Sequence, residues 1–184
     1  MAVTERETTT AAFVTQLQCA YDVELQLVNA LPRIAVAASA DELRSTLDVH
    51  LEETRGHVAR LEATFRLVGV SPSATPRAAL AGVLAQCPAV FEHGDPGTAA
   101  NDAALIDICR RIARIEIETY EALVASATTL AMDDAATMLQ ETLDEERYAD
   151  SALLALTVAD VDDLDHIGAG DGRQGSRTLV PRTE

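Results

Sequence analysis

Hydrophobic residues recur at intervals of three and four along four long stretches of the chain. These stretches cover about residues 9–36, 39–68, 99–128 and 133–156. Spacings of three and four place side chains on one face of an α-helix. The pattern therefore predicts four long amphipathic helices, each with one apolar stripe that faces a shared core.

The connections between these helices are very unequal in length. Only a few residues separate the first helix from the second, which opens with Ser39 and Glu42 at the spacing of a capping box. The third and fourth helices are joined as tightly, and helices with such short connections are antiparallel neighbours. Pro32 is expected to kink or end the first helix.

The segment between the two hairpins is a long crossover, residues 69–98. Within it, Thr75 and Pro76 predict the start of a shorter helix that continues to about Phe91. A single long crossover between two hairpins is the connectivity of ferritin-like bundles. We therefore predict an all-α, ferritin-like four-helix bundle of two antiparallel helical hairpins, with a long crossover that carries a short extra helix.

Composition indicates where the folded domain ends, and net charge indicates which classes of partner are disfavoured. Hydrophobic residues make up 48% of the 184, enough for one core, which we place in residues 1–159; residues 160–184 lack any period and are expected to form a flexible tail. The net charge of −16 argues against binding to nucleic acids or membrane surfaces, whose phosphates such a chain repels. A homodimer is expected because two-fold contacts are the commonest assembly.

The absence of Lys and the spacing of the Cys residues add two expectations. All 14 basic residues are Arg, which favours a protein of a salt-loving organism, although a GC-rich genome also favours Arg. The three Cys residues form no C-x-x-C pair, and neither a secretion signal nor a membrane-spanning run is visible. These features predict a reduced, cytoplasmic protein.

Each predicted long helix carries an ionisable residue where its apolar stripe should continue. The stripes hold Glu24 in the first helix, Glu116 in the third, and Glu146 with Asp150 in the fourth. In the second helix the apolar stripe is interrupted by His50, Glu53 and His57. A single Glu at such a place is commonly a boundary residue that reaches solvent, because stripes are imprecise by one position.

Coincidence at the middle of all four helices favours a metal centre. Four buried carboxylates without counter-ions are untenable, and no Lys is present to neutralise them. Oxygen ligands with an imidazole suit Fe or Mn, so we expect two carboxylate-bridged ions. The predicted ligands are Glu24, Glu53, His57, Glu116, Glu146 and Asp150. His50 competes with His57, Glu145 competes with Glu146, and His57 and Asp150 are either ligands or partners of ligands.

Several sequence blocks in this order resemble a known family. They include residues 21–24 (Tyr-Asp-Val-Glu), residues 50–54 (His-Leu-Glu-Glu-Thr), Glu116 with Tyr120, and residues 141–146 with Asp150. Over about residues 10–158 the chain resembles the YciE/YciF family of ferritin-like stress proteins. The resemblance implies a rubrerythrin-like di-metal bundle, often dimeric.

The resemblance also implies site residues. It carries the family's helix carboxylates onto Glu24, Glu53, Glu116 and Glu146, and its usual Asp onto Asp150. The position of His57 is His or Gln among relatives. Ala113 departs from the pattern, because relatives often have Glu there, and this departure bears on how fully the metal sites fill.

Two functions follow as expectations. The first is a di-iron or di-manganese carboxylate protein, related to stress, that performs redox chemistry on oxygen or peroxide or binds iron. Catalase-, peroxidase- and ferroxidase-like activities are not separable from the sequence, so whether the protein is an enzyme stays open. The second is a non-enzymatic helical scaffold whose metal is structural or absent.

Overall fold

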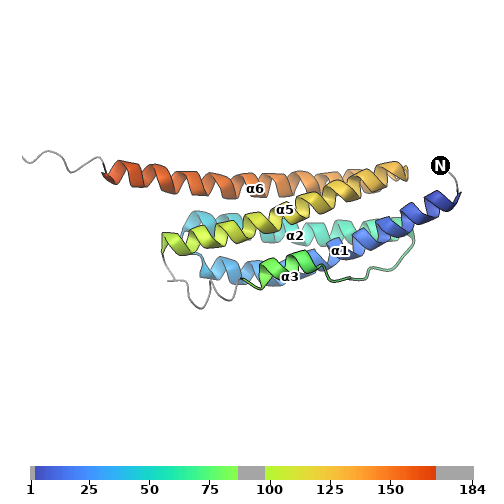
Figure 1. Cartoon of the computed structure of the whole chain (residues 1–184), viewed down its shortest axis with the longest axis horizontal. Coiled ribbons are helices and arrows are strands. Elements are labelled where there is room, and N and C mark those ends of the chain that lie inside the picture. Colours follow the sequence, from blue (N-terminus) through green and yellow to red (C-terminus); the bar gives the residue numbers. More distant parts are fainter. Residues whose placement is uncertain (1–2, 87–97, 169–184) are drawn as a thin grey trace, which may run out of the picture.

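The protein is an all-helical bundle in the part of the chain that the structure describes, residues 3–86 and 98–168 of a computed structural model (Figure 1). Those residues form five helices and no strand. The helices are α1 (Val3–Ala37), α2 (Asp41–Val68), α3 (Ala78–Leu84), α5 (Ala99–Thr129) and α6 (Asp133–Gly168). The predicted fold class is confirmed.

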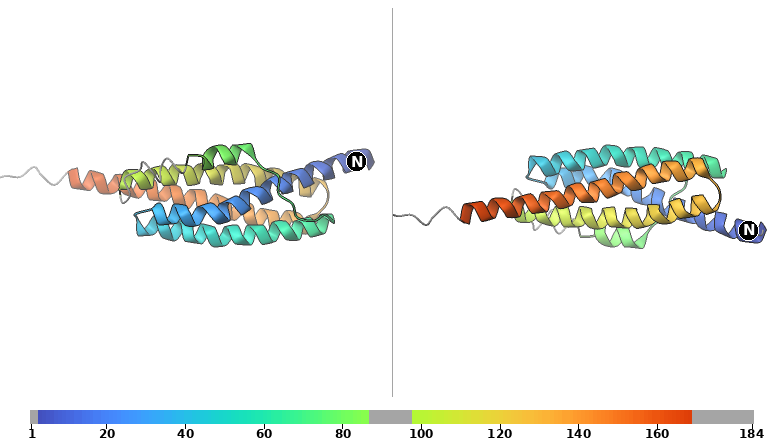
Figure 2. Two further views of the ribbon diagram at one scale, coloured as in Figure 1. Left: turned by 90° about the horizontal axis from the view of Figure 1, so that it is seen from below. Right: turned by 90° about the horizontal axis from the view of Figure 1, so that it is seen from above.

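The four long helices pack as two antiparallel hairpins side by side. Short connections, residues 38–40 and 130–132, join α1 to α2 and α5 to α6. Across the hairpins, α1 packs against α5 and α2 against α6. The chain leaves α2 at one end of the bundle and returns along its side to begin α5 at the other end, as the views in Figures 1 and 2 show. This return is the long crossover that ferritin-like bundles share.

The ends of the helices follow from local chemistry. Thr98 accepts a hydrogen bond from the backbone N–H of Asn101 and thereby caps the start of α5. Gly69 closes α2 in the left-handed conformation at φ 79°, which an L side chain adopts only at a cost. At the start of α2 the N-cap is Ala40, whose methyl group cannot accept a hydrogen bond from the first backbone N–H groups of the helix. The predicted capping box of Ser39 and Glu42 is therefore wrong.

The crossover is tied to the bundle just before its short helix and by that helix itself. The backbone N–H of Thr75 donates to the carbonyl of Gln18 at 3.0 Å, and the guanidinium of Arg77 donates to the hydroxyl of Thr119. In α3, Leu80 is fully buried and packs into the core against α5. The extra helix begins at Ala78 instead of Pro76, and its expected end near Phe91 lies outside the described residues.

Two helices run further than the sequence indicates. Pro32 does not end α1, which continues to Ala37 and begins at Val3. Helix α6 continues to Gly168, so the first part of the expected tail, from residue 160, is helical. Residues 169–184 lie outside the described part of the chain. None of the described helices is long and apolar enough to cross a membrane.

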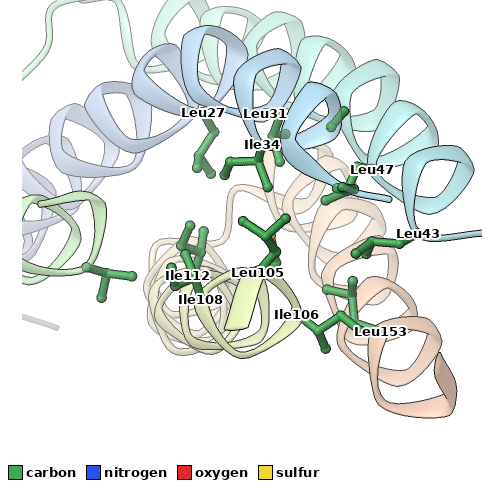
Figure 3. Packing of buried hydrophobic residues seen from close by; sticks show 14 of the residues in the cluster. Leu27, Leu31, Ile34, Leu43, Leu47, Leu105, Ile106, Ile108, Ile112 and Leu153 are labelled. Carbon is green, nitrogen blue, oxygen red and sulfur yellow. The ribbon is translucent and has the colours of Figure 1, made fainter. Parts of the chain in front are cut away.

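A polar layer divides the buried interior into two hydrophobic clusters. One cluster holds Leu27 and Leu31 of α1, and Figure 3 shows how they face side chains of the other three long helices. The second cluster holds Phe13 and Leu17, earlier on the same helix. Glu24 lies between these two pairs along α1, and the other three long helices change from one cluster to the other at the same level.

Candidate metal centre

Five ionisable side chains occupy this polar layer, and all are buried. They come from the four long helices: Glu24 from α1, His50 and His57 from α2, Glu116 from α5 and Glu146 from α6. None has more than 2% of its surface exposed. Each lies three or four residues from apolar neighbours on its own helix, so the packing that buries the apolar stripe also draws these groups inward.

Two groups of three ligand atoms overlap at one carboxylate. In the first group, Nδ1 of His57 lies 3.4 Å from Oε1 of Glu24 and 3.2 Å from Oε1 of Glu146. In the second, Nε2 of His50 lies 3.4 Å from Oε1 of Glu146, and Glu116 completes the set. The ligand atoms of each group all lie within 4.8 Å of one another. Glu146 belongs to both groups.

Most of the polar atoms at the centre of this layer have no hydrogen-bond partner within the chain. The unpartnered atoms are Oε2 of Glu24, both ring nitrogens of His50, Nδ1 of His57, and both carboxylate oxygens of Glu116 and Glu146. A buried polar atom without a partner is unfavourable by about 1–3 kcal/mol, and more if it is charged. Carboxylate oxygens and imidazole nitrogens that converge in this way fit cations such as Fe or Mn.

The electrostatics of the metal-free centre also favour the binding of cations. Burial raises the pKa of the Glu116 carboxyl well above its usual range, and the Glu146 and Glu24 carboxylates raise it further. Burial opposes the charging of His57, but the carboxylates of Glu24 and Glu146 outweigh it and raise its pKa to about 9. The same Glu146 raises the pKa of His50 against the effect of burial. Without cations, the layer therefore holds protons to limit its negative charge.

The pKa of Glu146 moves in the opposite direction. Burial alone would raise it, yet the imidazoles of His50 and His57 more than compensate, and the pKa lies below its usual range. Glu146 thus stays ionised more readily than Glu116 does. That property suits the residue that both groups of ligand atoms share.

His57 is held from behind by a carboxylate near the surface. Its Nε2 lies 2.9 Å from Oε2 of Glu145, which also forms an ion pair with Arg60. Arg60 donates from Nε to the hydroxyl of Thr142 at 2.8 Å. A proton on Nε2 that faces Glu145 leaves the lone pair of Nδ1 directed to Glu24 and Glu146, as a metal ligand requires.

Tyr120 holds Glu24 from the other side. Its hydroxyl donates to Oε1 of Glu24 at 2.5 Å, and the ring lies 6.1 Å from that of His57 in an edge-on arrangement. Burial raises the pKa of this phenol well above its usual range, and Glu24 adds to the effect. Tyr120 therefore keeps its proton and remains a hydrogen-bond donor to the carboxylate.

Two of the six predicted ligands lie outside the cluster. Glu53 is only half-buried and faces a hollow beside His50, because it sits one position off the inward face of α2. The carboxylate of Asp150 is bound by Arg110 of α5, with Nε 2.8 Å from Oδ1. The other four predicted residues, Glu24, His57, Glu116 and Glu146, do meet.

The structure also adds residues and resolves alternatives. It brings both His50 and His57 into the layer, where the sequence left a choice between them, and it places Glu146 inside with Glu145 behind it. The ion pair of Arg60 with Glu145 gave no signal in the sequence. Its two residues lie 85 positions apart on different helices.

Comparison with known proteins gives a consistent picture. Residues 8–163 match the model of a family described as a domain of unknown function, DUF892. Protein YciF of Escherichia coli strain K12 is 31% identical over 150 residues, which cover 81% of this chain and 90% of that protein.

Two solved structures share the fold. The crystal structure of the E. coli stress protein YciF matches with a TM-score of 0.76 and 29% identity, over 84% of this chain and 97% of that one. YcfI of Rhodopseudomonas palustris matches with a TM-score of 0.75 and 28% identity, over 83% of this chain and 97% of that one.

Proposed function

This chain belongs to the DUF892 family of YciF-like proteins, and from its own buried centre we propose that it is a di-metal carboxylate protein. In this proposal two Fe or Mn ions bind in the polar layer and react with dioxygen or peroxide. The observation that carries the proposal is the pair of ligand groups that share Glu146, together with their unpartnered atoms. The E. coli relative is described as a stress protein, and such chemistry is consistent with that description.

The residues divide into two sets of ligands. Glu24 and His57 would hold one ion, His50 and Glu116 would hold the other, and Glu146 would serve both. Three carboxylates bring a charge of −3 into a layer that the protein otherwise has to protonate. Two divalent cations would neutralise this negative charge, which gives a physical reason for burying the three carboxylates.

A bound pair of such ions supplies redox steps between the divalent and trivalent states, and the chain supplies the surroundings. The carboxylates favour the higher charge, and Tyr120 and Glu145 hold the ligands Glu24 and His57 in place. The hydrophobic clusters on both sides of the layer keep bulk water away from it. Catalase-, peroxidase- and ferroxidase-like outcomes all suit this arrangement.

The test compares metal content with turnover. Protein loaded with Fe or Mn and then desalted is expected to hold two ions per chain by mass spectrometry of the metal, and to consume hydrogen peroxide. Glu146→Gln should lose at least one ion and the activity, because both groups use this carboxylate. Glu141→Gln, an exposed residue of the same helix, is the matched control. Full metal content in Glu146→Gln would overturn the proposal.

A structural bundle is the second candidate, and the closed nature of the centre favours it. Every residue of the two ligand groups is at most 2% exposed, so an ion there would be well shielded from solutes. Protein that binds ions and gains stability but leaves peroxide and dioxygen unconsumed would support this role over the redox one.

A further inference from the structure

A hollow of about 150 Å³ between α2 and α6 reaches the polar layer. At its mouth stand Val49 of α2 and Tyr148 of α6, which are 52% and 68% exposed. Its lining includes His50, which is only 2% exposed and belongs to one of the two ligand groups. The hollow therefore connects the surface of the molecule to an edge of the candidate metal centre.

Small side chains on both helices create this hollow. It is lined by Ser45 on α2 and by Ala149 and Ala152 on α6. These side chains are small and leave space that a larger side chain would occupy. Larger side chains lie against two other residues of the layer. Glu145 and Arg60 cover His57, and Tyr120 covers Glu24.

Size and charge limit what this hollow can admit. Pockets for drug-sized organic ligands measure about 300–1,000 Å³, whereas one water takes about 30 Å³ in the liquid. A volume of about 150 Å³ thus suits a solute of a few heavy atoms. The carboxyl group of Glu53 in the wall, on a chain of net charge −16, disfavours anions.

We propose that this hollow is the entry route by which small uncharged solutes, dioxygen or hydrogen peroxide, reach the centre beside His50, and that Glu53 discriminates against anions on the way. The proposal rests on the di-metal function proposed above. It gives Glu53 a role different from the ligation that the sequence predicts, because the side chain faces the hollow and not the ligand groups.

The first test uses the metal-free chain and dissolved dioxygen as the probe. Dioxygen is paramagnetic, so it speeds the nuclear relaxation of methyl groups that it can approach. The Ala149 methyl, in the wall, should relax several-fold more per unit of dioxygen than that of Ala113, which is fully buried elsewhere. Equal effects on these two methyl groups would overturn the entry route.

Filling the hollow should remove that difference. Ala152→Leu from α6 and Ser45→Leu from α2 are each expected to reduce the effect at Ala149 several-fold. Two variants on different helices guard against one that fails to fold. Ala122→Leu is the control, because it fills a separate hollow of about 220 Å³ whose lining includes no residue of the centre. An unchanged effect at Ala149 in both filled variants would also overturn the route.

The second test addresses the charge of Glu53 in iron-loaded protein. Azide, a small anion, and hydrogen peroxide are mixed separately with the protein, and the two association rates are compared by stopped-flow absorbance. Glu53→Gln should raise the ratio of the azide rate to the peroxide rate several-fold, and an unchanged ratio would remove the discrimination. If the wild-type chain binds no metal, the proposed function fails, and the dioxygen measurement still decides the route.

Discussion

The hydroxyl of Ser39 donates a hydrogen bond to Oδ2 of Asp102 at 2.6 Å and thereby joins the two hairpins where α2 and α5 begin. The same carboxylate accepts from the backbone N–H of Ser39 and of Ala40, both at 2.8 Å. Asp102 is 4% exposed. A residue of one hairpin thus takes the part of a helix cap for the other.

We expect Asp102→Asn to lower the free energy of unfolding by about 2 kcal/mol at neutral pH, because the amide nitrogen cannot accept the bonds that reach one oxygen. Urea unfolding measures this loss. Asp107→Asn is the control, since Asp107 lies on the same helix with its side chain 72% exposed. A loss equal to that of the control would mean that the cap contributes nothing.

The same pair gives a pH dependence with a definite sign. Burial opposes the charging of Asp102, but the bonds from Ser39 and Ala40 outweigh it and hold the pKa of this carboxyl below its usual value. Its stabilisation is therefore complete above the unfolded pKa of about 3.9 and is lost as pH falls through the lower folded value. The difference between wild type and Asp102→Asn should shrink below about pH 4 in urea unfolding; a constant difference would contradict this account.

Removal of metal should lower the melting temperature. A ligand present at a hundred times its dissociation constant stabilises the native state by about 2.7 kcal/mol. The gap between loaded and chelated protein should narrow as pH falls, because protons compete for the Glu and His ligands. Scanning calorimetry at several pH values measures it. An equal melting temperature with and without chelator, at every salt concentration, would favour a scaffold without a metal site.

Glu145 is expected to act on the metal through His57. Glu145→Ala should weaken metal binding about 10- to 100-fold, because the imidazole loses the partner that sets its tautomer. Glu145→Gln keeps an acceptor oxygen for Nε2 and should recover part of that loss. Competition with a coloured chelator gives the affinities, and Glu141→Gln, exposed on the same helix, is the control. Equal affinities for the Ala and Gln variants would show that the hydrogen bond to His57 has no effect.

Salt should stabilise the protein. The screening length falls from about 30 Å at 0.01 M ionic strength to about 3 Å at 1 M, so repulsion within a chain of net charge −16 weakens. We expect the melting temperature to rise between these two conditions, with sodium chloride used instead of a salt that strengthens burial generally. A flat profile would show that the surface charge has little influence on folding.

The sequence predicts the bundle well because its information is periodic. The stripe through Glu24 in α1 and those through Glu116 and Glu146 in α5 and α6 have the three- and four-residue steps of a helix face, and all three residues are buried. In α2 two inward faces compete. His50, Thr54 and His57 form the buried one. Glu53 precedes Thr54 in the sequence, so it lies about 100° from Thr54 around the helix, at the edge of this face.

What periodicity cannot show is which helix supplies a partner. Asp150 follows Glu146 at a helical spacing, but Arg110 on α5 binds its carboxylate and withdraws it from the centre. The start of α2 also depends on a contact with another helix. The acceptor for the hydroxyl of Ser39 is Asp102, 63 residues away, and not the nearby Glu42. Both arrangements arise from contacts between the helices, which the spacing within each helix does not encode.

The polar layer between the two hydrophobic clusters also fixes the axial alignment of the helices. A long helix lined with aliphatic side chains can slide along its neighbours by one turn, about 5.4 Å, with little change in the apolar area it buries. Here such a slip would set Leu27 of α1 or Leu143 of α6 against the buried carboxylates and leave Glu24 or Glu146 among aliphatic side chains. The centre thus selects one axial register of the four long helices, whichever ion it binds.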